Sequence, residues 1–504
     1  MFVRRLKHKN GKTYIQVVDK SSGNYRVVKS FGSSDKQTAI EELVEKANRW
    51  IKTESGVIEL DFEDETTRFN NLLNNIISHK LIGIHLVLGK IFDEIGFNQI
   101  KDELFKDLVL YRLVYPKSKL KTTEYLYRYE QKEYSEDEIY RYLDKLNGTQ
   151  KETVQNISYQ HTKSILGGEI NIVSYDVTTV YFEIDNEGEL RKTGFSKEGK
   201  HQNPQIVLGL LVSKNGYPLA YDIFEGNQFE GHTMLPIIDS FRNKYHLQQL
   251  VIVADSGLLS NKNIEELKQK KYEFVLGARI KNESKKIKEK ILALNLKNGE
   301  SQIIKKGDLK LIITYSDGRA KKDKYNREKG LRKLEKKVRT GKLTKASINN
   351  RGYNKYLKLE GEIKVIIDKD KFEQDAKWDG LKGYLTNAKM GKETILENYS
   401  HLWRIEKAFR VSKTDLKIRP IFHRKQKRIE AHICLNFIAY KVYKELERQL
   451  EEKKSDLSPE KVIEILQSVY QIEILTPKTK KIIKKTLLLT SEHKQLSEIF
   501  NFGC

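Results

Sequence analysis

Cysteine is nearly absent from this chain of 504 residues, which contains only Cys434 and Cys504. The two thiols are far apart and follow no paired spacing, so neither a disulfide framework nor a cysteine zinc site is indicated. Long apolar runs are missing as well, since no stretch approaches the roughly 18–20 residues that span a bilayer. The N-terminus, MFVRRLKHKNGKTY, lacks the apolar core of a signal peptide. We therefore expect a cytoplasmic protein with no membrane partner.

Acidic residues are in deficit, because 69 Asp and Glu stand against 93 Lys and Arg, which leaves a formal net charge of +24. Such a balance favours a polyanionic partner, and nucleic acid is the first candidate. Residues 319–345 alone hold thirteen basic and three acidic residues. A solvated helix with Glu–Lys pairs is the alternative, but three acids cannot neutralise thirteen bases, so we expect contact with DNA phosphates. The side chains expected to make this contact include Lys333, Lys336, Lys337 and Arg339.

Changes in periodicity divide the chain into six segments. They are a small basic β-hairpin and helix module (1–55), a helical, DNA-binding domain (56–168), the first part of an α/β core (169–280), a basic β-rich insertion (281–390), the second part of the core (391–450) and a C-terminal helical tail (451–504). For the helices of the second segment, packing on the next domain is an alternative to DNA binding. Strand-like pieces at 310–316 and 362–368 are the reason for expecting a β-rich insertion.

The α/β core begins with NIVSYDVTTVYFE (171–183), whose β-branched and aromatic residues predict a strand. Asp176 lies in its middle, where an unpaired carboxylate costs several kcal/mol. Two strands joined by Asn-Gly follow (204–226), and the order β-β-β-α-β-α-β to residue 278 predicts a mixed sheet between helices. A buried strand ends at Asp255, which places that carboxylate at the edge of the sheet.

Two carboxylates on neighbouring strands repel each other, and each would raise the pKa of the other. A divalent cation such as magnesium can keep both of them ionised. The alternative is that Asp176 accepts a backbone hydrogen bond and Asp255 caps a helix. Glu406 is the candidate third ligand, beside an apolar stripe that should pack on the sheet. The stripe consists of Leu402, Ile405, Phe409 and Leu416. For Glu406 the alternative is an i,i+4 ion pair with Arg410.

The order Asp176, Asp255, a long insertion and then Tyr399-x2-Leu402-x3-Glu406-x6-Lys413 resembles the insertion-sequence DDE transposases. Their signature is Tyr-x2-Arg-x3-Glu-x6-Lys, so three of its four positions match and Leu402 replaces the usual arginine. VADSGLLS (253–260), YLTN (384–387) and RPIFH (419–423) add to the similarity, which covers residues 170–445. It implies a ribonuclease H-like mixed sheet flanked by helices, interrupted by an insertion before the glutamate.

The resemblance also implies a function, the binding of the ends of a mobile DNA element with metal-dependent strand cleavage and strand transfer. Asp176, Asp255 and Glu406 would hold two Mg²⁺ ions, with Mn²⁺ as a substitute. Water would nick an element end, and a freed 3′-hydroxyl would serve in later transesterifications. The implied partners are double-stranded DNA, from the element ends and the target, and a second copy of the chain. The expected location is the DNA of a bacterial cytoplasm.

Other residues receive roles that rest partly on this resemblance. Tyr399 and Lys413 are expected to hold a DNA phosphate near the metals from one helix face, with Arg410 beside them, and a plain polar rim is the alternative. Trp378 is a candidate for stacking on an unpaired base, against the alternative of core packing. Two other functions are the alternatives. A ribonuclease H-like DNA nuclease without strand transfer would share all three carboxylates, whereas intact carboxylates argue against a catalytically silent DNA-binding repressor.

Overall fold

The structure is a computed structural model that describes residues 1–56, 65–146, 149–258, 260–340, 343, 347–349, 352–360, 364–476 and 479–502. Cys504 and part of the basic run 319–345 lie outside the described residues. The chain divides into two compact units, Met1–Ile77 with Glu473–Ile483 and Ser78–Ile472 with Lys484–Cys504. Among the described residues, no helix is both long enough and apolar enough to cross a membrane.

The N-terminal module is a small antiparallel sheet covered by one helix. Its elements are β1 (Phe2–Lys7), β2 (Thr13–Asp19), β3 (Arg26–Ser34) and α1 (Gln37–Glu54), followed by α2 (Glu65–Asn74). Ile15 and Val17 of β2 are buried against Ile40 and Ala47 of α1, because alternation in the strand and helical spacing in α1 both direct apolar side chains to one interface. The strands and the helix expected in this module are therefore present.

Helices make up most of the next segment, as its period predicted. They are a short π-helix (His85–Gly89), α3 (Lys90–Ile95), α4 (Glu103–Val114), α5 (Lys119–Glu130), α6 (Glu136–Lys145) and α7 (Thr149–Ile165). Ser135 caps α6 together with Glu138 in a reciprocal capping box, which explains why the helix begins at residue 136.

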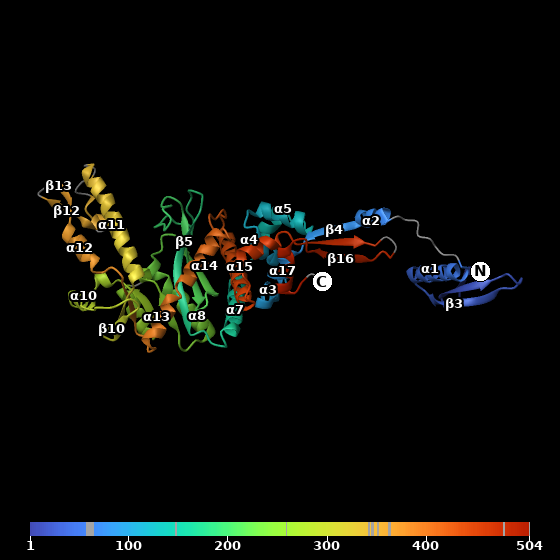
Figure 1. The fold of residues 1–504 in the computed structure, drawn as a ribbon, viewed down its shortest axis with the longest axis horizontal. Coiled ribbons are helices and arrows are strands. Elements are labelled where there is room, and N and C mark those ends of the chain that lie inside the picture. The colour runs from blue at the N-terminus through green and yellow to red at the C-terminus, as the bar shows by residue number, and fades with distance from the viewer. Residues whose placement is uncertain are drawn as a thin grey trace. The chain divides into compact units, whose positions relative to one another are not determined.

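The core of the second unit is a mixed sheet of eight strands in the order β10-β11-β14-β9-β8-β5-β6-β7. Figure 1 labels β5 and β10 of this sheet. Its first part contains β5 (Ile172–Tyr181), β6 (Gln205–Ser213), β7 (Pro218–Glu225), α8 (Met234–Tyr245), β8 (Val251–Ala254), α9 (Asn261–Gln269) and β9 (Glu273–Ala278). β5 pairs antiparallel with β6 and parallel with β8, and β8 pairs parallel with β9. The predicted order of strands and helices from 171 to 278 is confirmed.

Helices cover both faces of this sheet. On one face, Val173, Tyr175 and Val177 of β5 belong to an apolar cluster that includes residues of α8 and α9. The other face is covered by α13 (Lys392–Ser400), α14 (Trp403–Thr414) and α15 (Gln426–Glu452). Because side chains alternate along a strand, Asp176 projects to the face on which α14 packs.

Residues 281–390 extend the main sheet and add a small second core. They form α10 (Lys285–Leu292), β10 (Ser301–Lys306), β11 (Leu309–Tyr315), α11 (Asp317–Arg339), β12 (Leu357–Glu360), β13 (Lys364–Ile367), α12 (Lys369–Ala376) and β14 (Leu381–Thr386). The strands expected at 310–316 and 362–368 are present as β11 and β13. However, β10 and β11 join the main sheet, because β14 pairs with both β11 and β9. Only β12 and β13, of the described strands in this segment, form a separate hairpin, against which α11 packs through Leu334.

The C-terminal segment is not wholly helical, in contrast to the expectation for 451–504. It contains α16 (Pro459–Leu466) and α17 (Ser491–Phe500), but also β15 (Tyr470–Leu475) and β16 (Ile482–Leu487). These strands form a sheet with β4 (Ile76–Leu81), in the order β16-β15-β4. The partner strand lies near the other end of the sequence, so local periodicity could not reveal the pairing.

Candidate active site

Strand register brings Asp176 and Asp255 to neighbouring positions. In the parallel pair of β5 and β8, Tyr175 lies opposite Ala254, so the next residue along each strand is one of the two acids. Asp176 is partly buried in the middle of β5, whereas Asp255 follows the end of β8 and is exposed. The side chain of Asp176 accepts a hydrogen bond from the Val177 amide at 2.7 Å.

Glu406 reaches the same place from α14. The predicted apolar stripe is confirmed, because Leu402, Ile405, Phe409 and Leu416 are all buried. Their burial fixes the rotation of α14 on the sheet and leaves Glu406 exposed beside the stripe. Asp176, Asp255 and Glu406 together line one cavity of about 220 Å³. No ion pair joins Glu406 to Arg410 within the part of the chain that the structure describes, and Arg410 is exposed.

The electrostatics of this cavity disfavour a charged Asp176. Burial raises the pKa of its carboxyl to about 6, and the nearby carboxylates of Asp255 and Glu230 act in the same direction. Lys197 and the Val177 amide oppose the rise in this pKa. A divalent cation would favour the ionised form of Asp176, and carboxylate oxygens are the ligands that Mg²⁺ prefers. The donor set therefore fits a hard divalent ion.

A different group of possible metal ligands lies among the helices of residues 85–130. His85, Asp107 and Glu130 offer ligand atoms that lie within 4.8 Å of one another, and of the described residues only this group meets that spacing. The ammonium group of Lys132 already lies between the two carboxylates, with its Nζ 2.7 Å from Asp107 and 3.1 Å from Glu130. This group is a buried ion-pair network, and the carboxylates of the 220 Å³ cavity are more widely spaced.

Tyr399 contributes to the cavity from a separate helix. The expected single helix through 399–413 is interrupted, since α13 ends at Ser400 and α14 begins at Trp403. The hydroxyl of Tyr399 donates a hydrogen bond to Asp255 Oδ1 at 3.2 Å. Burial, followed by the charge of Asp255, raises the pKa of Tyr399 well above its usual range, so this hydroxyl keeps its proton.

Lys413 lies at the other end of α14. Its Nζ contacts Glu198 Oε1 at 2.9 Å, and Glu198 also pairs with Arg419. Burial lowers the pKa of Lys413 to about 8, with a further lowering from Lys197, while Asp176 acts in the opposite direction. Lys413 is thus close enough to Asp176 for their charges to interact. Its expected contact with a DNA phosphate stays a prediction.

Lys382 is a residue of the cavity that sequence reasoning missed. It lies on β14, lines the cavity with the three acids, and places its ammonium 4.5 Å from the centre of the Tyr399 ring. Burial lowers the pKa of Lys382, whereas Asp255 and Glu406 act to raise it. The only feature of the sequence that could have pointed to Lys382 is its position in LKGYLTN, two residues before the YLTN segment. The pairing of β14 with β9 brings Lys382 to the cavity.

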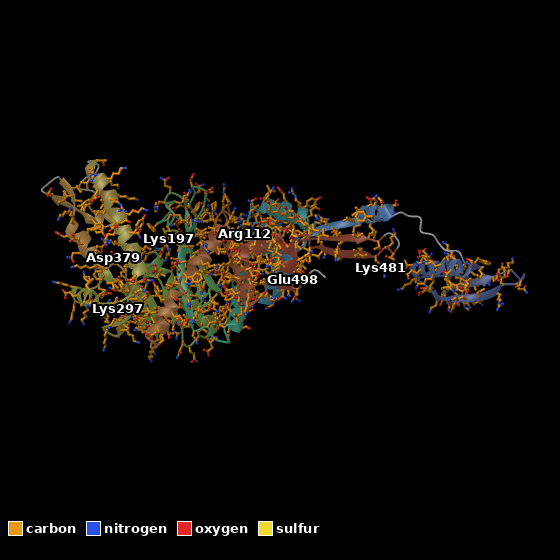
Figure 2. The ribbon with its side chains drawn as sticks, viewed as in Figure 1. Arg112, Lys197, Lys297, Asp379, Lys481 and Glu498 are labelled. Atoms are coloured by element: carbon orange, nitrogen blue, oxygen red, sulfur yellow. The ribbon has the colours of Figure 1, made fainter. Side chains whose placement is uncertain are left out.

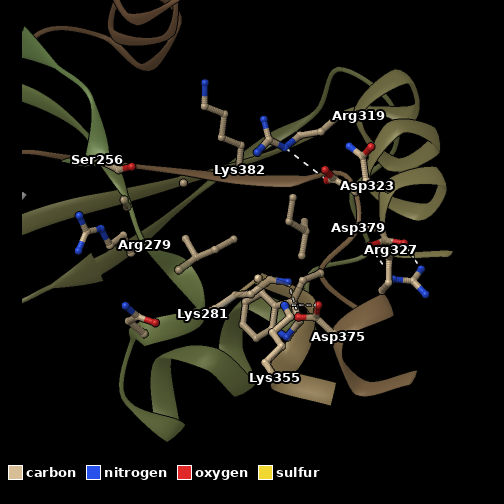
Figure 3. A pocket seen from close by; sticks show the side chains of 18 of the residues that line it. Ser256, Arg279, Lys281, Arg319, Asp323, Arg327, Lys355, Asp375, Asp379 and Lys382 are labelled. Carbon is tan, nitrogen blue, oxygen red and sulfur yellow. Dashed lines mark hydrogen bonds and ion pairs between the residues drawn. The ribbon is translucent and has the colours of Figure 1, made fainter. Parts of the chain in front are cut away.

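Lys382 also lines a larger cavity of about 820 Å³ (Figure 3). Figure 3 shows Lys382 and Arg319 on one side of it and the cluster around Asp375 on the other. Asp375 pairs with both Lys281 and Lys355, so a single carboxylate offsets only part of the charge of these two lysines.

Trp378 lines this cavity as well, but it is half-buried and packs against the apolar cluster of the sheet. Its base-stacking role stays a prediction.

The basic run up to Arg339 lies in one long helix, α11, which extends from Asp317 to Arg339. Lys333, Lys336, Lys337 and Arg339 are exposed along it. None of the four has an ion-pair partner among the residues that the structure describes, so the alternative of intrahelical Glu–Lys pairing does not apply to them.

Comparison with known proteins gives a family and distant structural neighbours. Residues 168–442 match the family model described as "Transposase DDE domain". A cryo-EM structure of the piggyBac transposase synaptic complex with hairpin DNA is similar with a TM-score of 0.39 and 10% identity, covering 80% of this chain and 81% of that one. The Mos1 transposase paired-end complex with the left transposon end gives a TM-score of 0.16 and 12% identity, covering 46% and 66%. No curated protein matches the chain.

Proposed function

The chain belongs to the Transposase DDE domain family and is thus a transposase, and we propose that Asp176, Asp255 and Glu406 are its catalytic carboxylates. The observation that carries this assignment is that the three acids line one cavity within the residues that the family model covers. When bound, divalent ions supply Lewis acidity that activates an attacking oxygen and stabilises a leaving oxygen at phosphorus. The proposed cofactor is two Mg²⁺ ions, replaceable by Mn²⁺, because carboxylate oxygens are the ligands that Mg²⁺ prefers.

The surrounding residues would orient the carboxylates and receive the substrate. Tyr399 holds Asp255 by its hydroxyl, and the Val177 amide holds Asp176, so both carboxylates have a defined orientation before DNA binds. Lys382 and Lys413 bring ammonium groups close to these acids, where they can bind the phosphate of a DNA strand. No covalent enzyme intermediate is needed, because the metals and the alignment of the strands carry the displacement.

The proposed substrate is double-stranded DNA, first at the ends of a mobile element and then at a target. The net charge of +24 and the exposed basic helix α11 support this partner. The modules at 1–55 and 56–168 are proposed to bind DNA as well. We propose that the DNA complex contains two copies of the chain, since two ends must be processed together, in a bacterial cytoplasm.

Strand transfer is the activity that distinguishes a transposase from a nuclease of the same fold. The full chain is incubated with Mg²⁺, a target plasmid and precut duplexes carrying the inverted repeats that flank its gene. We expect covalent joining of the 3′ ends to the target. Cleavage of uncut ends without any joining would instead indicate a nuclease, and end binding without nicking in Mg²⁺ or Mn²⁺ would indicate a silent DNA-binding protein.

The lysines of α11 should account for a measurable part of the DNA affinity. Lys333, Lys336 and Lys337 replaced together by Gln should weaken binding to any duplex sequence, because phosphates carry no sequence information. The plot of log K against log salt should become flatter by about 0.9 for each phosphate that the variant no longer neutralises. Fluorescence anisotropy over a range of salt concentrations measures this slope.

A matched control separates a local effect of α11 from a change in total charge. Lys285, Lys286 and Lys290 of α10 are also exposed, and replacing them by Gln removes the same charge. If both triple variants flatten the slope equally, α11 has no special role. An unchanged slope in the α11 variant means that this helix faces solvent in the complex.

A further inference from the structure

A third cavity in the larger unit is lined by cations and, within the described part of the chain, by no acid. Its volume is about 240 Å³, and it lies between the start of α5 and the segment before α15. The basic side chains that line it are Arg112, Lys117, Lys119, Lys417, Arg419 and the imidazoles of His423 and His432. Arg112, which is labelled in Figure 2, lies on α4 and is buried.

The positive charges of Arg112 and Lys119 are largely buried, and no neighbouring carboxylate that the structure describes balances them. Arg112 is 7% exposed and Lys119 is 4% exposed, and neither side chain has a hydrogen-bond or ion-pair partner among the described residues. Burial lowers the pKa of Arg112 to about 10, and burial together with Arg112 lowers that of Lys119 well below its usual value. A buried cation without a partner is costly, so folding alone gives no reason for two of them side by side.

A histidine adds an unpaired polar atom to the same cavity. His432 is 5% exposed, and its Nε2 lies 3.0 Å from the Ile418 carbonyl, to which it donates when protonated there. Its Nδ1 is buried and has no hydrogen-bond partner in the described structure. The ring of His423 lies 5.4 Å from that of His432. Burial, followed by the charges of Arg112 and Lys119, lowers the pKa of both imidazoles, so they are neutral without an anion, and a bound anion would favour the protonated, donating form.

The nearest acids are already engaged elsewhere. The charge of Asp144 acts to raise the pKa of His423, but both carboxylate oxygens of Asp144 accept hydrogen bonds from the Arg428 guanidinium, at 2.8 and 2.9 Å. Glu198 binds Arg419 on one side and Lys413 on the other. In addition, α5 begins at Lys119, so the amide groups of its first turn also favour negative charge at this position.

We propose that this cavity binds a phosphate group through Arg112, Lys119 and His432. Arginine and lysine are the usual ligands of phosphate, and a cavity with cations but no carboxylate selects an anion. The phosphate can come from the DNA backbone, which rests on the proposed function, or from free inorganic phosphate.

The position of the cavity favours DNA as the source of the phosphate. Arg419, which lines the cavity, forms an ion pair with Glu198, and Glu198 also pairs with Lys413 on the active-site helix α14. Phe422, which is largely exposed, adds an aromatic face at the cavity.

The test compares Lys119→Met with the intact chain in two measurements. In thermal unfolding, inorganic phosphate at the same ionic strength as chloride should raise the Tm of the intact chain by about 2–4 °C or more. The variant should unfold at a higher Tm in chloride, because an uncompensated cation is gone, and should not respond to phosphate. In binding to a duplex of arbitrary sequence, the variant should lower the slope of log K against log salt by about 0.9.

Lys441→Met is the matched control, because Lys441 is also a buried lysine but donates hydrogen bonds to the Ser158 carbonyl at 3.1 Å and to Thr162 Oγ1 at 2.6 Å. It should lower the Tm and leave both the phosphate response and the salt slope as in the intact chain. If Lys119→Met does not fold, Lys119→Gln, which keeps a polar group without the charge, takes its place.

The two measurements also identify the source of the phosphate. A lost phosphate response with an unchanged slope assigns free phosphate, and a reduced slope assigns the DNA backbone. The proposal is overturned if Lys119→Met behaves like the intact chain in both measurements. Neither measurement requires cleavage, so such a failure would leave the assignment of the catalytic carboxylates untouched.

Discussion

Asp176→Asn, Asp255→Asn and Glu406→Gln should each reduce metal-dependent DNA cleavage by more than about 10³-fold. Each change removes a negative ligand from the cavity that the three acids share while keeping the size of the side chain. Affinity for DNA should stay within a few-fold, because the carboxylates contribute little to a long, positively charged interface. Cleavage of labelled element ends in Mg²⁺ and in Mn²⁺, with binding measured in parallel, gives both quantities.

The fold of these variants can be checked without activity. Asp176→Asn should unfold at the same or a higher Tm in metal-free buffer, because burial and the charge of Asp255 already disfavour an ionised Asp176. Asp415→Asn is the matched control, an exposed acid at the end of α14 outside the cavity, and it should cleave like the intact chain. Substantial cleavage by any one of the three variants removes that residue from the proposed site.

Leu402→Arg should lower the free energy of unfolding by roughly 2–5 kcal/mol. Leu402 stands where the family signature has arginine, but here it is 8% exposed and belongs to the apolar cluster with Ile405 and Phe409. An arginine at this position would bury a charge and remove packing on the sheet, so α14 would lose part of its support. Denaturant unfolding monitored by circular dichroism measures the loss.

The neighbouring residue supplies the control for Leu402→Arg. Trp403 is exposed, so Trp403→Arg introduces the same charge one position later and should change the unfolding free energy by about 0.5 kcal/mol or less. A Leu402→Arg variant that is as stable as the intact chain and cleaves faster would contradict the packing role. It would show that position 402 opens onto a phosphate site, as the signature implies.

The sequence by itself indicated which three carboxylates to propose for the site and the order of the elements that carry them. An aspartate inside a β-branched run, a second one at the end of a buried strand, and a glutamate beside a helical apolar stripe are all local patterns. They were sufficient to predict Asp176 on β5, Asp255 after β8 and Glu406 on α14, because alternation and helical spacing set which side chains face a core. The excess of basic residues in 319–345 is also local, and it predicted the exposed cations of α11.

Only the tertiary structure decided which residues meet. The register that sets Tyr175 opposite Ala254 makes the two aspartates neighbours, and the pairing of β14 with β9 brings Lys382 beside them. The break between α13 and α14 turns Tyr399 toward Asp255, where a continuous helix had been expected. The cationic cavity around Arg112 joins segments about 300 residues apart, as the distance in sequence from Arg112 to His432 shows. Contacts of this kind depend on long-range packing, which leaves no periodic trace in the sequence, so the acids could be predicted and their surroundings could not.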